Sequence, residues 1–454
     1  MPKIKELPSL REWERISAHT HITGLGLEGL RAKKIGDGMV GQTEAREAAG
    51  IIVRLIKEGK FAGRGILIAG PPGSGKTALS VGIAKELGKD VPFVHLAASE
   101  VFSAEVKKTE FLTQALRKAI GVRIHEMRKI YEGVVEEINI EKQAHPYNPY
   151  VQIPVSATIK LSTKDESKRL SMDQTFAMQL VQQNVETGDV IQIDVDGGHL
   201  VKLGRSEEAA KEKKVEITTE KPVPVPSGKV LKEKEFVYVM TLHQLDLASS
   251  RSELDMFSLL FGGRERKEIE SEVRKQVDEM VKAMVQAGKA EIIPGVLFID
   301  ECSMLDIETF GFLNRAMEQE LAPIIIFATN RGIAKIRGTD QVAPHALPLD
   351  LLDRLLIINT RPYNEEEIRE IIKIRAKVEK VEISEDALEL LTKLGMESSL
   401  RYALQLIAPA YEVAKENGAK KVRKEDVEKV KELFIDVKQS AKYLKEFEEK
   451  FLTF

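Results

Sequence analysis

One segment near the start of the chain limits the possible folds more than any other: RGILIAGPPGSGKTALSVGIAKEL, from Arg64 to Leu87. Its apolar run at 66–69 predicts a short buried strand. A turn rich in glycine and proline follows, and helical periodicity runs from Lys76 to Leu87. The turn spells G-x-x-x-x-G-K-[ST] in the strand–loop–helix context which that pattern requires. The sequence therefore predicts an α/β fold with a phosphate-binding loop, rather than an ordinary turn between a strand and a helix.

The residue types in this loop explain how it would hold phosphate. Glycines let the backbone curl so that its N–H groups point at phosphate oxygens, and the following helix N-terminus adds positive potential. Lys76 can reach the β- and γ-phosphates, and the hydroxyl of Thr77 is placed for Mg²⁺. The residues predicted to bind the nucleotide here are Gly70, Pro71, Pro72, Gly73, Ser74, Gly75, Lys76, Thr77 and Ala78.

A second segment, GVLFIDECSMLD, ends an apolar run (296–299) in two adjacent acids, Asp300 and Glu301. Either the acids mark the point where the chain reaches water, or they face a cation. An intact phosphate loop elsewhere in the chain favours the second interpretation. Asp300 could then hold magnesium through water, and Glu301 could orient and deprotonate an attacking water. Both would lie at the carboxyl end of a parallel strand, where ligands bind in such sheets.

Three further polar residues are candidates that the sequence alone leaves open. Asn330 follows the apolar run of APIIIFATNRG and could position the same water, although asparagine after a strand is also ordinary turn chemistry. Arg354 lies between two apolar runs, where a structural salt bridge is the usual role. Arg401 falls in the first turn of an amphipathic helix and could face either a phosphate or solvent.

These residues, in this order, resemble the RuvB-like subfamily of AAA+ ATPases, whose eukaryotic members are called pontin and reptin and which also has archaeal members. The similarity covers nearly the whole chain, and HTHITGLGL and PLDLLDRLLII are its most specific segments. The resemblance implies that Lys76 and Thr77 form the Walker A pair and that Asp300 and Glu301 are the Walker B acids. It further implies that Asn330 is sensor 1, Arg401 is sensor 2 and Arg354 is the arginine finger.

The same resemblance implies the ligands, ATP or ADP with Mg²⁺, and the remainder of the pocket. His19 and His21 are similar to a His-x-His that lies over the nucleotide, although capping or packing would explain them without the family match. The adenine pocket would be lined by Met39, Val40, Tyr363 and Ile371. An arginine that acts on a neighbour's ATP needs a head-to-tail interface, which closes into a ring. The implied assembly is a homo-hexamer, as a single or a double ring.

One departure from the family pattern concerns the residues after the acid pair. Pontin and reptin continue it with Val-His, whereas this chain has Cys302 and Ser303. A helicase assignment taken from a DExH label is therefore unsupported, while the acids needed for hydrolysis are intact.

The interval between Lys76 and Asp300 is far longer than two βαβ steps of about 30 residues each. We therefore expect an AAA+ core at 1–122 and 291–362, an inserted domain at 123–290 and a helical lid at 363–454. In the insert, helical periodicity over 109–130 gives way to alternating strands with a hairpin turn at Gly197-Gly198. The family's insert carries an OB-fold, and 204–235 is expected to be an exposed loop.

The expected work of the ATPase is remodelling of DNA or chromatin with possible helicase activity; the alternative is an ATP-regulated scaffold that assembles protein complexes. DNA or RNA would pass through the insert or the channel. Tyr147, Tyr150, Lys107 and Lys108 are candidate contacts, with turn packing and solvated charge as alternatives. The net charge of −3 does not mark a nucleic-acid binder overall. One cysteine and the absence of a secretory or membrane-spanning run favour a cytoplasmic protein, or a nuclear one if the source is eukaryotic, with protein clients and no membrane.

Overall fold

The computed structural model describes residues 19–61, 63–88, 90–102, 106–145, 148–195, 197–212, 223–250 and 268–451. They form two compact units. The first comprises Met1–Val122, Val239–Ala283 and Ile292–Phe454, and the second comprises Arg123–Tyr238 and Met284–Glu291. Each unit is described by itself below.

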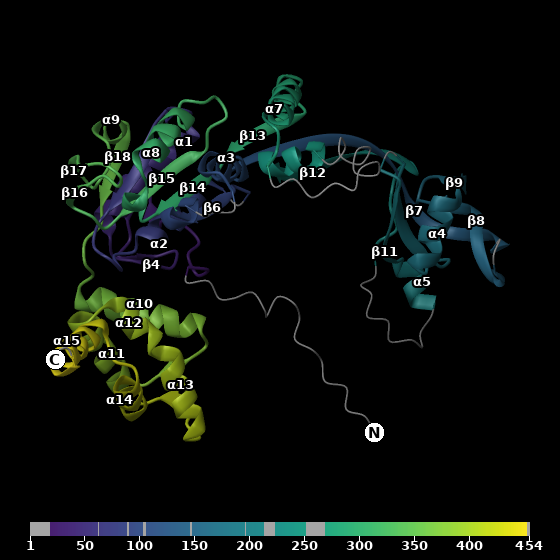
Figure 1. Ribbon diagram of the computed structural model, residues 1–454. Helices are drawn as coiled ribbons and strands as arrows, with labels where there is room; N and C mark the ends of the chain where they lie inside the picture. The colour runs from purple at the N-terminus through teal and green to yellow at the C-terminus, as the bar shows by residue number, and fades with distance from the viewer. Residues whose placement is uncertain are drawn as a thin grey trace. The chain divides into compact units, whose positions relative to one another are not determined.

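The first unit is built on a five-stranded parallel sheet in the order β18-β5-β15-β14-β6 (Figure 1). The strands are β5 (Gly65–Ala69), β6 (Phe93–Ala97), β14 (Val296–Asp300), β15 (Ile324–Thr329) and β18 (Leu355–Asn359). Every residue of β5 and of β15 is buried, which is why these strands appear in the sequence as unbroken apolar runs. The predicted α/β class and its strands are confirmed.

Helices cover both faces of this sheet, because alternate side chains of each strand point to opposite sides. Leu67 and Phe327 pack with the core that includes α3 (Lys108–Lys118) and α8 (Ile307–Ala316). Ile68 and Phe298 pack on the other face with α1 (Thr43–Lys57) and α2 (Lys76–Leu87). The predicted helix over 76–87 is confirmed. The sheet is thereby fixed as a rigid layer, with its carboxyl edge left to the connecting loops.

A buried arginine fixes the segment that precedes α1. This segment contains four short strands, from β1 (Leu27–Glu28) to β4 (Met39–Val40). The Arg46 side chain is fully buried, and burial lowers the pKa of its guanidinium from the usual value. It donates hydrogen bonds to the carbonyls of Leu25, Gly26, Lys33 and Gly41. A planar fork of donors can hold several backbone carbonyls at once, so one side chain organises the whole loop.

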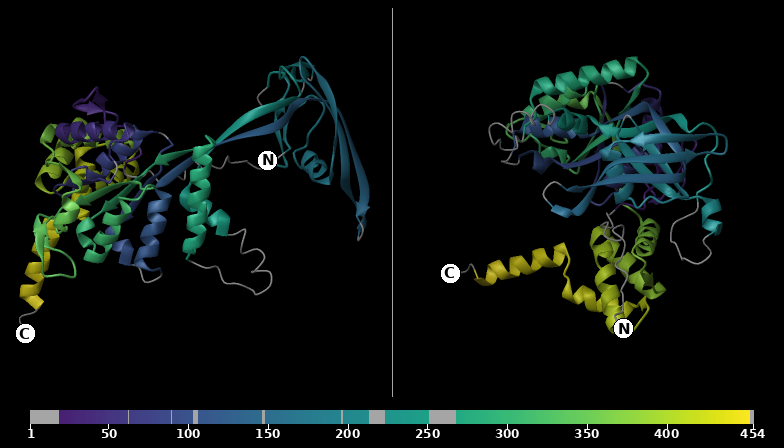
Figure 2. Two further views of the ribbon diagram at one scale, coloured as in Figure 1. Left: turned by 90° about the horizontal axis from the view of Figure 1, so that it is seen from above. Right: turned by 90° about the vertical axis from the view of Figure 1, so that its right-hand side faces the viewer.

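The chain after Pro362 is helical, as predicted. It forms α10 (Glu365–Val378), α11 (Glu385–Glu397), α12 (Leu400–Gln405), α13 (Ile407–Glu416), α14 (Lys424–Leu433) and α15 (Val437–Phe451). The amphipathic helix expected to contain Arg401 is the short α12, which ends at Gln405, and α13 follows directly after Leu406. In Figure 2 the last helix, in yellow, extends away from the other lid helices. Among the described residues, no helix combines the length and the apolar character needed to cross a membrane.

The second unit is an antiparallel sheet in the order β11-β10-β7-β8-β9, to which β12 (Leu231–Thr241) and β13 (Ala290–Pro294) add by pairing with β7. The strands of the central path are β7 (Ile120–His145), β8 (Asn148–Ser162), β9 (Ser167–Met172), β10 (Asp189–Asp194) and β11 (His199–Arg205). Helix α4 (Gln174–Gln182) comes between the third and fourth of these strands. The pairing of Asp194 with His199 confirms the predicted hairpin at Gly197-Gly198.

The structure corrects two details of the expected insert. The helical pattern over 109–130 is wrong beyond Lys118, because β7 already begins at Ile120. Segment 204–235 is not a loop throughout: α5 (Glu207–Glu212) lies within it, and β12 begins at Leu231. Helix α7 (Ser271–Gln286) lies in the segment expected to belong to the insert, but its residues up to Ala283 group with the first unit rather than the second.

Candidate nucleotide-binding site

Three neighbouring strands bring the predicted site residues to one edge of the parallel sheet. Thr329 of β15 pairs with Ala69 of β5, and Phe327 pairs with Ile299 of β14. The strands therefore end at nearly the same level. The phosphate loop, the acid pair and Asn330 emerge side by side as a consequence of this register.

The phosphate loop is held in place by close backbone packing. A Cβ atom at Gly70 would overlap the hydroxyl of Thr360, and one at Gly75 would overlap the hydroxyl of Tyr363. The Lys76 Nζ donates to the carbonyls of Gly70 and Pro71, at 3.0 and 2.9 Å. Burial lowers the pKa of Lys76, and the nearby Asp300 partly offsets this by favouring the charged form. The lysine is thus a partly desolvated cation at the centre of a curled loop.

The acid pair adopts a strained backbone. Glu301 has φ 52°, in the left-handed region that residues with a Cβ atom seldom occupy. Its N–H donates to Asp300 Oδ1 at 2.9 Å. Such outliers persist only where the surrounding structure over-determines them, and they concentrate at functional sites. Here the buried strand β14 determines where the turn must occur.

Asn330 is fixed through its two neighbours. The carbonyl of the buried Thr329 accepts a hydrogen bond from the Gly70 N–H at 3.2 Å, and the Thr329 hydroxyl accepts one from the Arg331 N–H at 3.1 Å. The end of β15 is therefore joined directly to the phosphate loop.

A cavity of about 450 Å³ collects most of the predicted residues. Those that line it are His19, His21, Met39, Val40, Pro72, Gly73, Gly75, Lys76, Thr77, Ala78, Asp300, Glu301, Asn330, Tyr363, Ile371 and Arg401. Four predicted residues are not among the lining residues. Gly70, Pro71 and Ser74 support the loop, with the buried Ser74 hydroxyl donating to the Pro71 carbonyl at 2.8 Å. Arg354 is partly exposed and forms an ion pair with Glu318.

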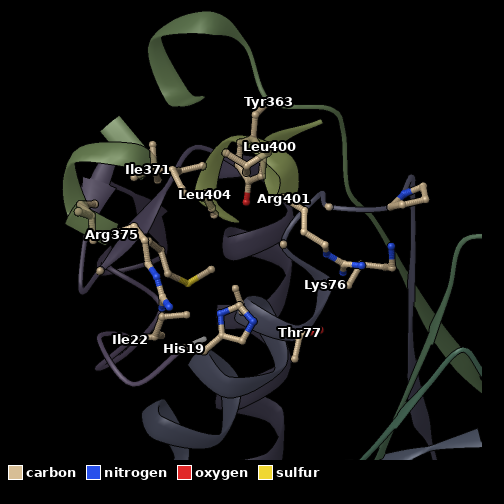
Figure 3. A pocket seen from close by; sticks show the side chains of 18 of the residues that line it. His19, Ile22, Lys76, Thr77, Tyr363, Ile371, Arg375, Leu400, Arg401 and Leu404 are labelled. Carbon is tan, nitrogen blue, oxygen red and sulfur yellow. The ribbon is translucent and has the colours of Figure 1, made fainter. Parts of the chain in front are cut away.

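Cationic and apolar side chains both line the cavity (Figure 3). Lys76 and Arg401 lie near each other on one side. Arg401 is in the first turn of α12, whose N-terminus is capped by the Ser399 hydroxyl. Ile22, Ile371 and Leu404 lie on the other side, together with Arg375, and their apolar surface could receive a planar base.

The two histidines at this cavity are uncharged at neutral pH. Burial, followed by the proximity of His21, lowers the pKa of His19 to about 4, and burial also lowers the pKa of His21. Among the described residues, His21 Nδ1 has no hydrogen-bond partner although it is buried. An orphaned ring nitrogen of this kind suits a polar ligand in the cavity.

Several lining or supporting residues were not predicted. Arg375 and Gln405 line the cavity, and the buried Thr360 braces the loop through Ser74 at 2.7 Å. Gln42 exchanges two hydrogen bonds with the backbone of Arg361 at the start of the lid. Helical spacing from Ile371 could have indicated Arg375. Nothing local indicates Gln42 or Thr360, because their partners are distant in sequence.

The residues present fit a nucleoside triphosphate with magnesium. The curled loop, Lys76 and Arg401 offer donors to phosphate, and His21, whose buried Nδ1 has no hydrogen-bond partner among the described residues, also lines the cavity. Among the described residues no group of three or more His, Cys, Asp or Glu side chains could hold a metal alone. Magnesium beside substrate phosphates usually needs only one or two carboxylates, and here Thr77 and Asp300 would supply the protein ligands.

Comparisons with known proteins agree with this geometry. A family described as the TIP49 P-loop domain matches residues 15–366, and the TIP49 AAA-lid domain matches residues 371–436. RuvB-like protein 1 of Arabidopsis thaliana is 46% identical over 458 residues, which cover 99% of each chain. RuvB-like helicase 1 of Aedes aegypti is 44% identical, covering 99% of this chain and 100% of its own.

The chain belongs to the TIP49 family of RuvB-like AAA+ ATPases. This confirms the resemblance noted in the sequence, the P-loop core with a helical lid, and ATPase activity. RuvB-like proteins bind nucleotide and generally form oligomeric rings.

The left-handed backbone of Glu301 predicts an unusual stability ranking for variants of this RuvB-like ATPase. Glu301→Gly and Glu301→Ala both remove the carboxylate, but only alanine retains the strain. We expect the glycine variant to be the more stable by roughly 0.5–1 kcal/mol, because the left-handed cost of a Cβ exceeds the extra unfolded-state entropy of glycine. Denaturant unfolding monitored by circular dichroism measures the difference. An alanine variant that is the more stable would show that the backbone at this position is unstrained.

Proposed function

We propose that this RuvB-like ATPase hydrolyses ATP with Mg²⁺ by in-line attack of water at the cavity between the sheet edge and the lid. The observation that carries the proposal is the convergence of Lys76, Asp300, Glu301, Asn330 and Arg401 on one cavity from four separate parts of the sequence. Phosphoryl transfer needs little covalent chemistry from the protein. Positioning and charge neutralisation by such residues are sufficient.

Each residue has one role in this proposal. Glu301 accepts the proton of the attacking water, and Asn330 orients that water. Lys76 and Arg401 neutralise charge that develops on the transferred phosphoryl group. Thr77 and Asp300 would hold a magnesium ion, which would offset the negative charge of the phosphates. The adenine lies among Met39, Val40, Tyr363 and Ile371, beneath neutral His19 and His21.

Arg354 completes the site of a neighbouring subunit in a homo-hexameric ring. It does not line its own chain's cavity, and its partly exposed side chain pairs with Glu318, which is half exposed. Exposed ion pairs are worth about 0–1 kcal/mol, so exchange of Glu318 for a neighbour's phosphate has little cost.

The work driven by hydrolysis is proposed to be remodelling of DNA or chromatin, with helicase activity. Relatives in Aedes aegypti and Drosophila melanogaster are named RuvB-like helicase 1. The strand order of the second unit, with a helix between its third and fourth strands, is also that expected of an OB-like nucleic-acid module. Of the proposed contacts, Tyr147 and the side chain of Tyr150 lie outside the described part of the chain, and Lys107 and Lys108 are ion-paired with Glu268 and Asp306.

A protein scaffold is the second candidate. It is favoured by exposed apolar side chains at the end of the lid: Leu433, Phe434, Ile435, Val437 and Leu444. Several exposed apolar side chains within one short segment are a feature of protein interaction sites.

Replacing Glu301 by Gln tests the base. We expect ATP affinity to stay within about twofold, because the amide keeps the shape of the side chain, and turnover to fall by at least roughly a hundredfold because proton acceptance is lost. Calorimetry measures binding and phosphate release measures turnover, with Glu308→Gln on the exposed side of α8 as the control. Wild-type turnover by the Glu301→Gln protein would show that another group is the base.

Mixed rings test the action of Arg354 on a neighbour. Arg354→Ala subunits lack the finger, and Lys76→Ala subunits lack phosphate binding. A mixture should regain part of the activity that neither variant has alone, since an intact cavity can then meet an intact Arg354. Activity is measured on rings whose mixed composition is verified by mass spectrometry. Absence of any recovery would argue against action between subunits.

A salt titration of DNA binding distinguishes an ATPase that acts on nucleic acid from a protein scaffold. If the ATPase acts on nucleic acid, single- or double-stranded DNA should stimulate turnover, and affinity should fall steeply between about 50 and 200 mM salt as phosphate contacts release counterions. Fluorescence anisotropy measures the affinity. Absence of both effects, together with ATP-dependent release of a protein partner, would favour the scaffold.

A further inference from the structure

Two consecutive residues with left-handed backbone lie between β15, which leads to Asn330 and is called the sensor strand below, and the proposed arginine finger, Arg354. His345 and Ala346 have φ 58° and 57°, in the turn that leads from β17 (Val342–Pro344) to α9 (Leu349–Leu352). Residues with a Cβ atom rarely take this conformation, and a pair of them needs strong external support. The turn is therefore held by its contacts rather than by local preference.

His345 forms two hydrogen bonds to the segment directly after Asn330. Its ring Nδ1 lies 2.9 Å from the carbonyl of Arg331, and its backbone N–H donates to the carbonyl of Gly332 at 2.7 Å. A carbonyl can only accept, so the ring carries its proton on Nδ1. The Arg331 N–H is in turn bound to the Thr329 hydroxyl. The turn at His345 is thus tied to the strand end that presents Asn330.

On its other side the turn is anchored to the segment that carries Arg354. Leu347 and Leu351 are buried in the same apolar core as β14 and β15. The Arg354 N–H donates to the Leu351 carbonyl, and the Arg354 carbonyl accepts from Gly65, the first residue of β5. These contacts fix the backbone between the turn and Arg354. A displacement at His345 would therefore be transmitted to Arg354.

We propose that His345 is a positioning residue that fixes the sensor strand end and the arginine-finger segment relative to one another. Through it, Asn330 in one subunit's site and Arg354 at the next subunit's site are held by a single clamp. His345 does not line the nucleotide cavity, so it acts through these two residues and touches no substrate. The inference rests on the roles proposed above for Asn330 and Arg354.

Three substitutions at this position test the clamp. His345→Ala and His345→Gly remove the ring donor, and glycine also relieves the backbone strain. His345→Asn retains a side-chain N–H donor and tolerates the left-handed conformation. We expect kcat to fall roughly threefold to tenfold in the Ala and Gly variants, the effect of losing one hydrogen bond, with KM for ATP unchanged. The Asn variant should recover most of kcat.

A control lies in the same hairpin. Asp340→Ala removes an exposed ion pair with Lys335 and should leave kcat unchanged. Thermal unfolding identifies any loss of fold, which the strain-free glycine variant should avoid. A Gly variant that is folded and has wild-type kcat would overturn the proposal, as would an Asn variant no better than Ala.

Amide hydrogen exchange tests the clamp independently of hydrolysis. Peptides within 330–347 should exchange faster in the Ala variant than in the wild type, and the Asn variant should restore protection. Unchanged exchange would refute the clamp. If the wild-type protein did not hydrolyse ATP but residues 330–347 were still protected by His345, the proposed function would be refuted and the clamp would not.

Mixed rings test the Arg354 side. His345→Ala is introduced into Lys76→Ala subunits, which contribute only their Arg354, and these are combined with Arg354→Ala subunits. The activity should be lower than in the same mixture with His345 intact. Equal activity would overturn the link to Arg354.

Discussion

The parallel pairing of β5, β15 and β14 is the constraint on which the site depends. Register places Ala69 beside Thr329 and Phe327 beside Ile299, so a one-residue slip would turn the apolar side chains to the wrong faces of the sheet. Both faces are covered by helices, which makes such a slip costly. The alignment needed for phosphoryl transfer is therefore a consequence of burying two apolar cores on one sheet.

Unfavourable local states gather at this edge because the buried layer behind it determines the backbone. Glu301 is left-handed, Lys76 is partly desolvated, and burial keeps His19 and His21 neutral. Each would relax in an isolated peptide. In the folded chain the sheet and its helices hold them, and the charges and dipoles of the edge are gathered at one cavity.

Local patterns were sufficient to predict the strands, the phosphate loop and the acid pair, because a few consecutive residues determine each of these features. The phosphate loop needs glycines at fixed spacing, and buried parallel strands need apolar runs. Partners distant in sequence left no such signal, as the bonds from Gln42 to Arg361 and from Arg46 to four carbonyls illustrate. At Lys118 the helical pattern failed because apolar residues spaced for a helix also alternate along β7, where Ile120, Val122 and Ile124 are buried.

The contacts at the start of the lid explain how a separate helical layer can contribute Arg401 to a site built on the sheet. Gln42 holds the backbone of Arg361, and Arg361 forms two hydrogen bonds to Glu367 in the first turn of α10. Tyr363 packs against Gly75 of the phosphate loop, and burial raises the pKa of its hydroxyl to about 12, so that it stays neutral there. The entry to the lid is thus fixed to the loop that would hold the phosphates. In the proposed function, a shift of that loop on hydrolysis would pass through Tyr363 and α10 toward α12, so the lid would respond to the nucleotide state.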